Sequence, residues 1–211
     1  MSFALSSVGA SELHFFVGVR SATLAKLARG ADATSRIPIG RVTIPLQITL
    51  EKAHAQDVAA IAALRVAVAE RLTRDFGHGH WSAGGTESGV IRDMATPGLF
   101  LVREGARVIA TLRLAAKKPW AIDPAHFSAS QAPLYLTSMA VDPDRQRQGI
   151  GRACMSGAFG IARDKSADAI RLDAYDAPAG AGGFYEKCGF CEVARVVYRE
   201  TPLIYYELLL T

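Results

Sequence analysis

The fold of this chain is decided by the stretch Val141-Asp142-Pro143-Asp144-Arg145-Gln146-Arg147-Gln148-Gly149-Ile150-Gly151-Arg152. The apolar residues 134–141 lead into it and predict a strand, and residues 153–163 after it predict a helix. The free N–H groups at the start of such a helix carry about half a unit of positive charge. Gly149 and Gly151 have no Cβ, so an anion can approach the backbone closely there. The stretch therefore predicts a phosphate-binding turn.

Three arginines, Arg145, Arg147 and Arg152, add positive charge beside this turn. It is not a Walker loop, because no Lys or Ser/Thr follows the glycines. It is not a dinucleotide fingerprint either, because Cys154 stands where a third glycine is needed. The alternative is an ordinary strand–turn–helix with arginines in solvent. Three arginines at one turn suit a single pyrophosphate better than the row of phosphates in a nucleic acid.

A second motif follows further along the chain, Tyr185-Glu186-Lys187-Cys188-Gly189-Phe190. On its own, this pattern is typical of any helix C-terminus with a hydrophobic contact. It comes after Gln146-x-x-Gly149-x-Gly151, and the two motifs in this order resemble those of the GCN5-related N-acetyltransferases. The motifs that carry the resemblance lie within residues 134–190. The predicted order of helices and strands extends the resemblance to about residues 47–210.

The resemblance implies an α/β fold whose central mixed, mostly antiparallel sheet is splayed into a V and flanked by helices. Hydrophobic periodicity and turn residues predict the order strand, helix, helix, three strands, helix, strand, helix, two strands. Glu104-Gly105 marks a tight hairpin, and Glu200-Thr201-Pro202 is expected to form the last turn. The expected strands are 47–51, 99–102, 107–114, 134–141, 169–176, 193–199 and 203–209, and the expected helices are 57–74, 86–93, 153–163 and 180–187.

For ligands, the resemblance implies acetyl-CoA as co-substrate and no metal. The pantetheine arm would pair with the backbone inside the V, and the pyrophosphate would lie on amides of the turn. A β-bulge amide near Met139 would stabilise the oxyanion of the acyl group. Pro178 stands where many members have an asparagine that touches the cofactor. The expected cofactor-binding residues are Met139, Ala140, Val141, Arg147, Gln148, Gly149, Ile150, Gly151 and Arg152.

Tyr185 matches the tyrosine that serves the family as general acid. The leaving thiolate has a pKa near 8.5 and needs a proton, which a tyrosine with a pKa near 10 can supply. A primary amine has a pKa near 10.4 and must lose a proton before it attacks, so a base is also needed. Asp173 is the expected base, and the alternatives left open are Asp176, Glu51, His80 and Asp123.

The acceptor is expected to be a primary amine of a small molecule, because the loops that carry Trp81 and Trp120 would make a partly enclosed apolar site. A protein or peptide amine is one alternative, and a non-catalytic acyl-CoA-binding sensor is another. Residues 117–127 form a long connection that is either a working loop or a passive lid. A homodimer is also left open.

Residues 1–45 are expected to be a flexible extension of an N-acetyltransferase domain at 46–211. They hold five of the 24 basic residues and two of the 20 acidic ones, so 19 and 18 remain and the domain is nearly neutral. Their serines and few acids would also fit an organellar transit peptide. No apolar run reaches the roughly 20 residues of a membrane span. Neither a nucleic acid nor a membrane is expected as a partner.

Three cysteines, Cys154, Cys188 and Cys191, without a secretory signal predict a cytoplasmic protein. Cys188 and Cys191 have C-x-x-C spacing. However, Cys188 falls at a predicted helix C-terminus, where the dipole disfavours a thiolate. His78 and His80 share a glycine-rich loop, which is a weak pattern for a metal site.

Overall fold

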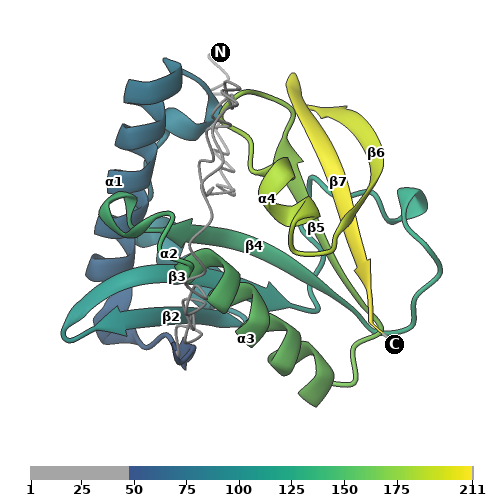
Figure 1. Ribbon diagram of the computed structural model, residues 1–211, viewed down its shortest axis with the longest axis horizontal. Helices are drawn as coiled ribbons and strands as arrows, with labels where there is room; N and C mark the ends of the chain where they lie inside the picture. Colours follow the sequence, from purple (N-terminus) through teal and green to yellow (C-terminus); the bar gives the residue numbers. More distant parts are fainter. Residues whose placement is uncertain (1–47, 211) are drawn as a thin grey trace, which may run out of the picture.

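A single seven-stranded sheet organises the computed structural model, which describes residues 48–210 (Figure 1). The strand order is β1-β2-β3-β4-β5-β7-β6, and among the described strands every neighbouring pair is antiparallel except β4 and β5. The strands are β1 Glu51–Lys52, β2 Leu99–Glu104, β3 Arg107–Ala115, β4 Pro133–Val141, β5 Ala169–Tyr175, β6 Cys191–Tyr198 and β7 Thr201–Leu209. The predicted mixed, mostly antiparallel sheet is confirmed.

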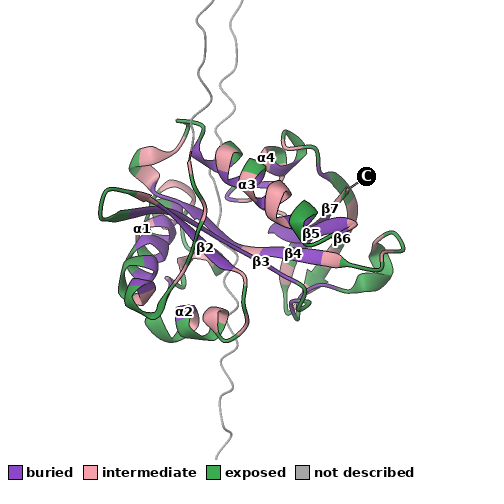
Figure 2. Ribbon diagram, turned by 90° about the horizontal axis from the view of Figure 1, so that it is seen from below, coloured by how far each residue is buried: buried purple, intermediate pink, exposed green. Residues whose placement is uncertain are grey.

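Helices cover both faces of the sheet (Figure 2). One face carries α1 (Val58–Phe76) and α2 (Glu87–Met94), and the other carries α3 (Ile150–Asp164) and α4 (Gly182–Glu186). Each helix turns its apolar side to the strands, as the buried residues Ile61, Leu64, Val68 and Leu72 of α1 illustrate. Within residues 48–210, none of the helices combines the length and the apolar character that a membrane span requires.

The predicted order of elements is confirmed, and three of the boundaries that differ have a clear cause. The first strand is reduced to two residues, because only Glu51 and Lys52 pair with β2 at this edge. Helix α3 starts at residue 150 rather than 153, capped by Gly149 at φ +86°. The last turn lies at Arg199 and Glu200, whose φ values of +47° and +68° suit a two-residue hairpin, so Thr201 and Pro202 belong to β7.

The expected N-terminal extension, residues 1–45, lies outside the described residues, so the domain boundary near residue 46 stays a prediction. The hairpin predicted at Glu104-Gly105 is confirmed. Glu104 pairs with Arg107 across the turn, and Gly105 has a left-handed φ of +60°. A residue without a Cβ adopts this conformation without strain.

The one parallel pair, β4 and β5, creates the opening in the sheet. The two strands are paired at 133–135 against 169–171, and no further pairing between them occurs among the described residues. Both nevertheless continue, β4 to Val141 and β5 to Tyr175. The strands therefore diverge towards their C-terminal ends, which confirms the predicted V.

Candidate active site

The turn between β4 and α3 presents backbone N–H groups at the open end of the V. Gly149 is the N-cap of α3 in the left-handed region, and Arg147 is also left-handed at φ +62°. The first hydrogen bond of the helix runs from the Ala153 N–H to the Gly149 carbonyl over 2.9 Å. The amides of residues 150–152 therefore have no partner within the helix itself. Together with the helix dipole they suit an anion.

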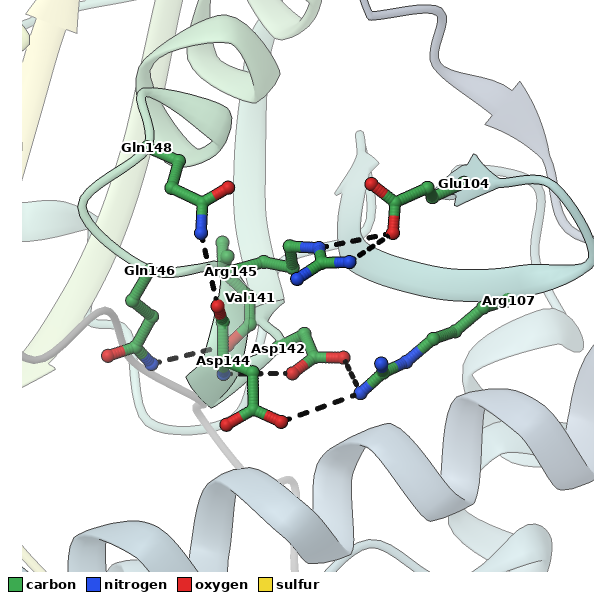
Figure 3. A network of polar contacts seen from close by, with 8 residues as sticks. All are labelled: Glu104, Arg107, Val141, Asp142, Asp144, Arg145, Gln146 and Gln148. Atoms are coloured by element: carbon green, nitrogen blue, oxygen red, sulfur yellow. Dashed lines mark hydrogen bonds and ion pairs between the residues drawn. The ribbon is translucent and has the colours of Figure 1, made fainter.

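Two glutamines brace the backbone of this turn (Figure 3). Gln146 Nε2 donates to the carbonyl of Val141 over 3.2 Å, and Gln148 Nε2 donates to the carbonyl of Asp144 over 3.1 Å. These contacts tie the turn to the end of β4 and to its own first residues. The anion-binding backbone is thus fixed by side chains of the motif itself.

Arg145 is not directed to the anion site, although the sequence placed it beside the turn. Its Nε and Nη2 donate to Glu104 Oε2 over 3.1 and 2.5 Å (Figure 3). The same hydrogen bond lowers the pKa of the Glu104 carboxyl. Arg147 and Arg152 are exposed at the start of α3, and they are the two arginines that can meet an anion there.

A β-bulge interrupts β4 beside the V. Thr111 of β3 faces Ala140, and Arg113 faces Thr137, so Ser138 and Met139 together occupy the place of one residue. Ser138 has a left-handed φ of +52°, which is unusual for a residue with a side chain. The bulge lies within the stretch where β4 has left β5. Met139, within the bulge, and Ala140 and Val141, after it, lie along this free edge.

Tyr185 reaches from α4 to the same place. Its side chain is 4% exposed, and its Oη donates to the Sδ of Met139 over 3.9 Å. The rings of Phe184, Phe190 and Tyr206 surround it, with centroids 5.3 to 6.3 Å away. Burial, followed by the nearby Asp173 carboxylate, raises the pKa of Tyr185 far above its ordinary value. Tyr185 is therefore protonated at neutral pH.

Asp173 lies on β5 with 4% of its surface exposed. It is the cross-strand partner of Tyr205 on β7. Its carboxylate adds to the effect of burial and raises the pKa of three tyrosines, Tyr175 (to about 12), Tyr185 and Tyr205. The structure thus brings the two predicted catalytic residues, Tyr185 and Asp173, into one electrostatic neighbourhood. Sequence reasoning missed Tyr175 and Tyr205.

Of the other four acid–base candidates, two form ion pairs with arginines and two contact tyrosines near Asp173. Glu51 lies on the edge strand β1 and pairs with Arg103, so the sheet order separates it from β5. Asp176 pairs with Arg195 over 2.8 Å. Two candidates do reach the tyrosines around Asp173: His80 stacks on Tyr175 with centroids 6.3 Å apart, and the Asp123 N–H donates to Tyr205 Oη over 3.2 Å.

A sequence model of the acetyltransferase (GNAT) family matches residues 56–190. The chain belongs to this family. Membership makes it an acyltransferase and implies acetyl-CoA as co-substrate and an amine as acceptor. No curated protein matches the chain significantly.

Solved structures of GNAT proteins share the fold. The ribosomal-protein-S18-alanine N-acetyltransferase from Escherichia coli superimposes with a TM-score of 0.55 at 18% identity, over 77% of this chain and 94% of that one. Ard1 from Thermoplasma volcanium gives 0.57 at 15% identity, over 78% and 98%. A GCN5-related N-acetyltransferase from Rhodopseudomonas palustris gives 0.58 at 18% identity, over 80% and 99%. At these identities the likeness shows the fold alone.

In this GNAT protein the two tryptophans expected to enclose the acceptor behave differently. Trp81 packs edge-on against Tyr175 at 5.9 Å, and its Nε1 donates to the Gly77 carbonyl over 3.1 Å. Trp120 is 74% exposed. Its loop is nevertheless held against β7, because the carbonyl of the neighbouring Ala121 accepts from Tyr205 Oη. That the loops carrying Trp81 and Trp120 partly enclose an apolar acceptor site stays a prediction.

The long connection between β3 and β4 is anchored to the sheet at a second point. Phe127 stacks on Tyr205 with centroids 5.4 Å apart, and the Arg171 guanidinium lies 4.9 Å from the Phe127 ring. Arg171 in turn pairs with Glu207 over 2.9 Å, both side chains being buried. This part of the connection is a fixed wall beside β5 and β7.

Cys154, Cys188 and Cys191 are all free thiols. Burial raises the pKa of Cys188, which disfavours the reactive thiolate. Among residues 48–210, no group of three or more His, Cys, Asp or Glu side chains is arranged to hold a metal ion.

Proposed function

We propose that this protein is an N-acetyltransferase that transfers the acetyl group of acetyl-CoA to a primary amine of a small molecule, with Tyr185 as general acid. The observation that carries the proposal is the position of the Tyr185 hydroxyl. It reaches from α4 to Met139, beside the bulge and the unpaired edge of β4. A thioester lying along that edge would have its sulfur within reach of a proton donor.

The backbone around the V suits acetyl-CoA. The pyrophosphate would lie on the amides of Arg147, Gln148, Gly149, Ile150, Gly151 and Arg152, where two left-handed residues and the start of α3 turn N–H groups outward. The pantetheine amides would pair with Met139, Ala140 and Val141, since β4 has no partner strand on its β5 side there among the described residues. When bound, acetyl-CoA supplies an acetyl group activated as a thioester.

Proton transfer on the acceptor side is assigned to Asp173. An alkyl ammonium with a pKa near 10.4 is protonated at pH 7, and its neutral form lies about 4.6 kcal/mol higher. Asp173, whose carboxylate contributes to the raised pKa of Tyr185, takes this proton directly or through a water. The amine nitrogen then forms a bond to the carbonyl carbon, the C–S bond breaks, and Tyr185 Oη gives its proton to the thiolate. The nitrogen loses its second proton as the amide forms, and this proton restores the Tyr185 hydroxyl directly or through a water.

The raised pKa of Tyr185 is compatible with this role. A thiolate released into water has a pKa near 8.5 and would be a weaker base than the tyrosinate. The same apolar surroundings also raise the pKa of a buried thiol, as burial raises that of Cys154 to about 12. Within the V, the pKa values of the proton donor and of the thiol that accepts the proton would therefore both be raised.

The walls of the acceptor side favour a small amine. Trp81 and Tyr175 form one wall, and the anchored segment with Phe127 and Tyr205 forms another. A peptide amine is the second candidate, because the exposed Trp120 offers an apolar contact outside these walls. A similar structure, from E. coli, is that of an enzyme named for ribosomal protein S18 alanine.

The test is release of CoA thiol from acetyl-CoA with a panel of small primary amines and of peptides. We expect turnover with at least one small amine and loss of most of it in Tyr185→Phe. The matched control is Tyr135→Phe, because Tyr135 is also 4% exposed but lies at the paired end of β4. Turnover with peptides alone would move the assignment to the second candidate. Binding of acetyl-CoA without turnover of any amine would refute the proposed function.

A further inference from the structure

Ser138 holds a backbone conformation that needs external support. Its φ is +52°, it carries a Cβ, and it is buried within the bulge of β4. The left-handed region is unfavourable for L-residues other than glycine. Such strain persists where surrounding contacts over-determine the conformation, and it is concentrated at functional sites.

The side chain of Ser138 is held from the helical layer. Ser138 Oγ donates to Asp93 Oδ2 of α2 over 2.9 Å. The same carboxylate pairs with Arg65 of α1 over 2.7 Å, and Arg65 is buried. Asp93 is itself fixed, because Arg113 of β3 donates from Nε to the Asp93 carbonyl over 3.1 Å. Helix α1 and strand β3 thus hold the aspartate that accepts from the serine hydroxyl.

The carbonyl of Ser138 is held from β3. Thr111 is fully buried, and its Oγ1 donates to this carbonyl over 3.2 Å. The carbonyl of Ser138 and the N–H of Met139 belong to one planar peptide unit, and none of the described peptide bonds is cis. In a trans unit the two groups point in opposite directions. A carbonyl held towards β3 therefore turns the Met139 N–H away from β3, towards the side on which the V opens.

We infer that Asp93 and Thr111 are positioning residues that hold the Ser138–Met139 peptide so that the Met139 amide points at the thioester carbonyl oxygen of acetyl-CoA. This inference rests on the proposed function, because it assigns the Met139 amide the task of stabilising the charge that develops on that oxygen. Asp93 acts through Ser138 Oγ and Thr111 acts through Ser138 O. Neither side chain needs to touch the ligand.

Three variants separate the parts of this arrangement without breaking the buried Arg65–Asp93 pair. Ser138→Ala removes the contact with Asp93 but keeps the Cβ that makes the left-handed backbone unfavourable. Ser138→Gly removes the same contact but adopts positive φ freely. Thr111→Val removes the contact with the carbonyl. Ser130→Ala is the matched control, because Ser130 also donates from its hydroxyl to an aspartate, Asp168, away from the V.

The direct readout is the 13C NMR shift of acetyl-CoA labelled at the acetyl carbonyl, bound to each protein without an amine. In the wild type the bound resonance should move downfield from that of free acetyl-CoA. In Ser138→Ala and Thr111→Val it should move back, and kcat should fall about 10- to 100-fold with the KM for acetyl-CoA changed less than threefold. Ser138→Gly should retain more activity than Ser138→Ala, and Ser130→Ala should behave as the wild type.

The possible results test the role of the Met139 amide and the positioning role of Asp93 and Thr111 separately. An unshifted carbonyl in the wild type would refute the role of the Met139 amide, whereas the proposed function is refuted only if no amine is turned over. A shifted carbonyl that stays the same in Ser138→Ala and in Thr111→Val would refute the positioning role alone. Ser138→Gly less active than Ser138→Ala would also refute it, because relief of the backbone strain would then count for nothing.

Discussion

Replacing Tyr185 with Phe should lower kcat about 10- to 100-fold and leave the KM for acetyl-CoA within threefold. The substitution removes one oxygen atom and keeps the ring. Phe184, Phe190 and Tyr206 still have an aromatic partner at 5.3 to 6.3 Å, so the packing of α4 on the sheet is preserved. The change is therefore confined to the proton donor.

The stability cost of this change should be small. The Tyr185 hydroxyl donates to the thioether sulfur of Met139 over 3.9 Å, and thioether sulfur is a weak acceptor. Loss of such a hydrogen bond should lower the free energy of unfolding by less than about 1 kcal/mol. A tenfold loss of kcat corresponds to about 1.4 kcal/mol in the activation free energy, and a hundredfold loss to twice that. The kinetic effect should thus exceed the effect on stability.

Steady-state thiol release and urea unfolding on the same preparations measure the two quantities. Because burial raises the pKa of Tyr185, its ionisation should cause no alkaline loss of wild-type kcat below about pH 10. Unchanged kcat in Tyr185→Phe would remove the residue from the mechanism. A loss of kcat accompanied by an equal loss of stability, with the same loss in Tyr135→Phe, would reduce its role to packing.

Gly149→Ala should weaken acetyl-CoA binding tenfold or more by calorimetry with little change of kcat at saturation, because alanine at φ +86° costs about 1–2 kcal/mol and shifts the turn. Glu207→Ala should lower the free energy of unfolding in urea by about 3–5 kcal/mol, because it leaves Arg171 buried and unpaired by a carboxylate. Arg195→Ala, in an exposed pair, should leave the midpoint of urea unfolding nearly unchanged. Hydrogen bonds from a serine hydroxyl and backbone amides lower the pKa of Asp168, so its stabilisation is present above the unfolded value of about 3.9 and is lost as the pH falls through the folded value. The Tm difference between wild type and Asp168→Asn should accordingly be largest above about pH 4 and shrink in acid, and a difference that grows in acid would contradict this assignment.

Most of the fold could be predicted because its signals are local. Apolar runs such as 134–141 and the spacing of Ile61, Leu64 and Val68 reveal strands and helices directly. The boundaries that differed are set by backbone conformation and pairing. Gly149 starts α3 early because it is left-handed, and β1 is short because its pairing ends at the sheet edge. Neither the left-handed conformation of Gly149 nor the end of the β1 pairing can be inferred from the hydrophobic pattern of the sequence.

Site residues that belong to a sequence motif could be predicted, whereas residues brought together only by strand pairing could not. Tyr185 and the glycines belong to motifs. Tyr175 could have been found, because it lies two residues after Asp173 and therefore on the same face of its strand. Tyr205 could not, since its place opposite Asp173 depends on β5 pairing with β7 rather than with the next strand in sequence. The contact of Ser138 with Asp93 likewise joins residues 45 apart.

The two irregularities of β4 separate the part of the proposed site that binds acetyl-CoA from the part that transfers protons. On the side of β3 the bulge at Ser138 turns one peptide unit, and on the side of β5 the loss of pairing after Tyr135 frees the strand edge. In the proposed site, the donor half is therefore built from backbone, which tolerates many side chains as long as its conformation holds. The proposed acid–base half consists of the side chains of Asp173 and Tyr185 on two further elements. Substitutions that disturb the turn at Gly149 should then act on acetyl-CoA affinity, and substitutions at Tyr185 on turnover, because different parts of the chain carry the two tasks.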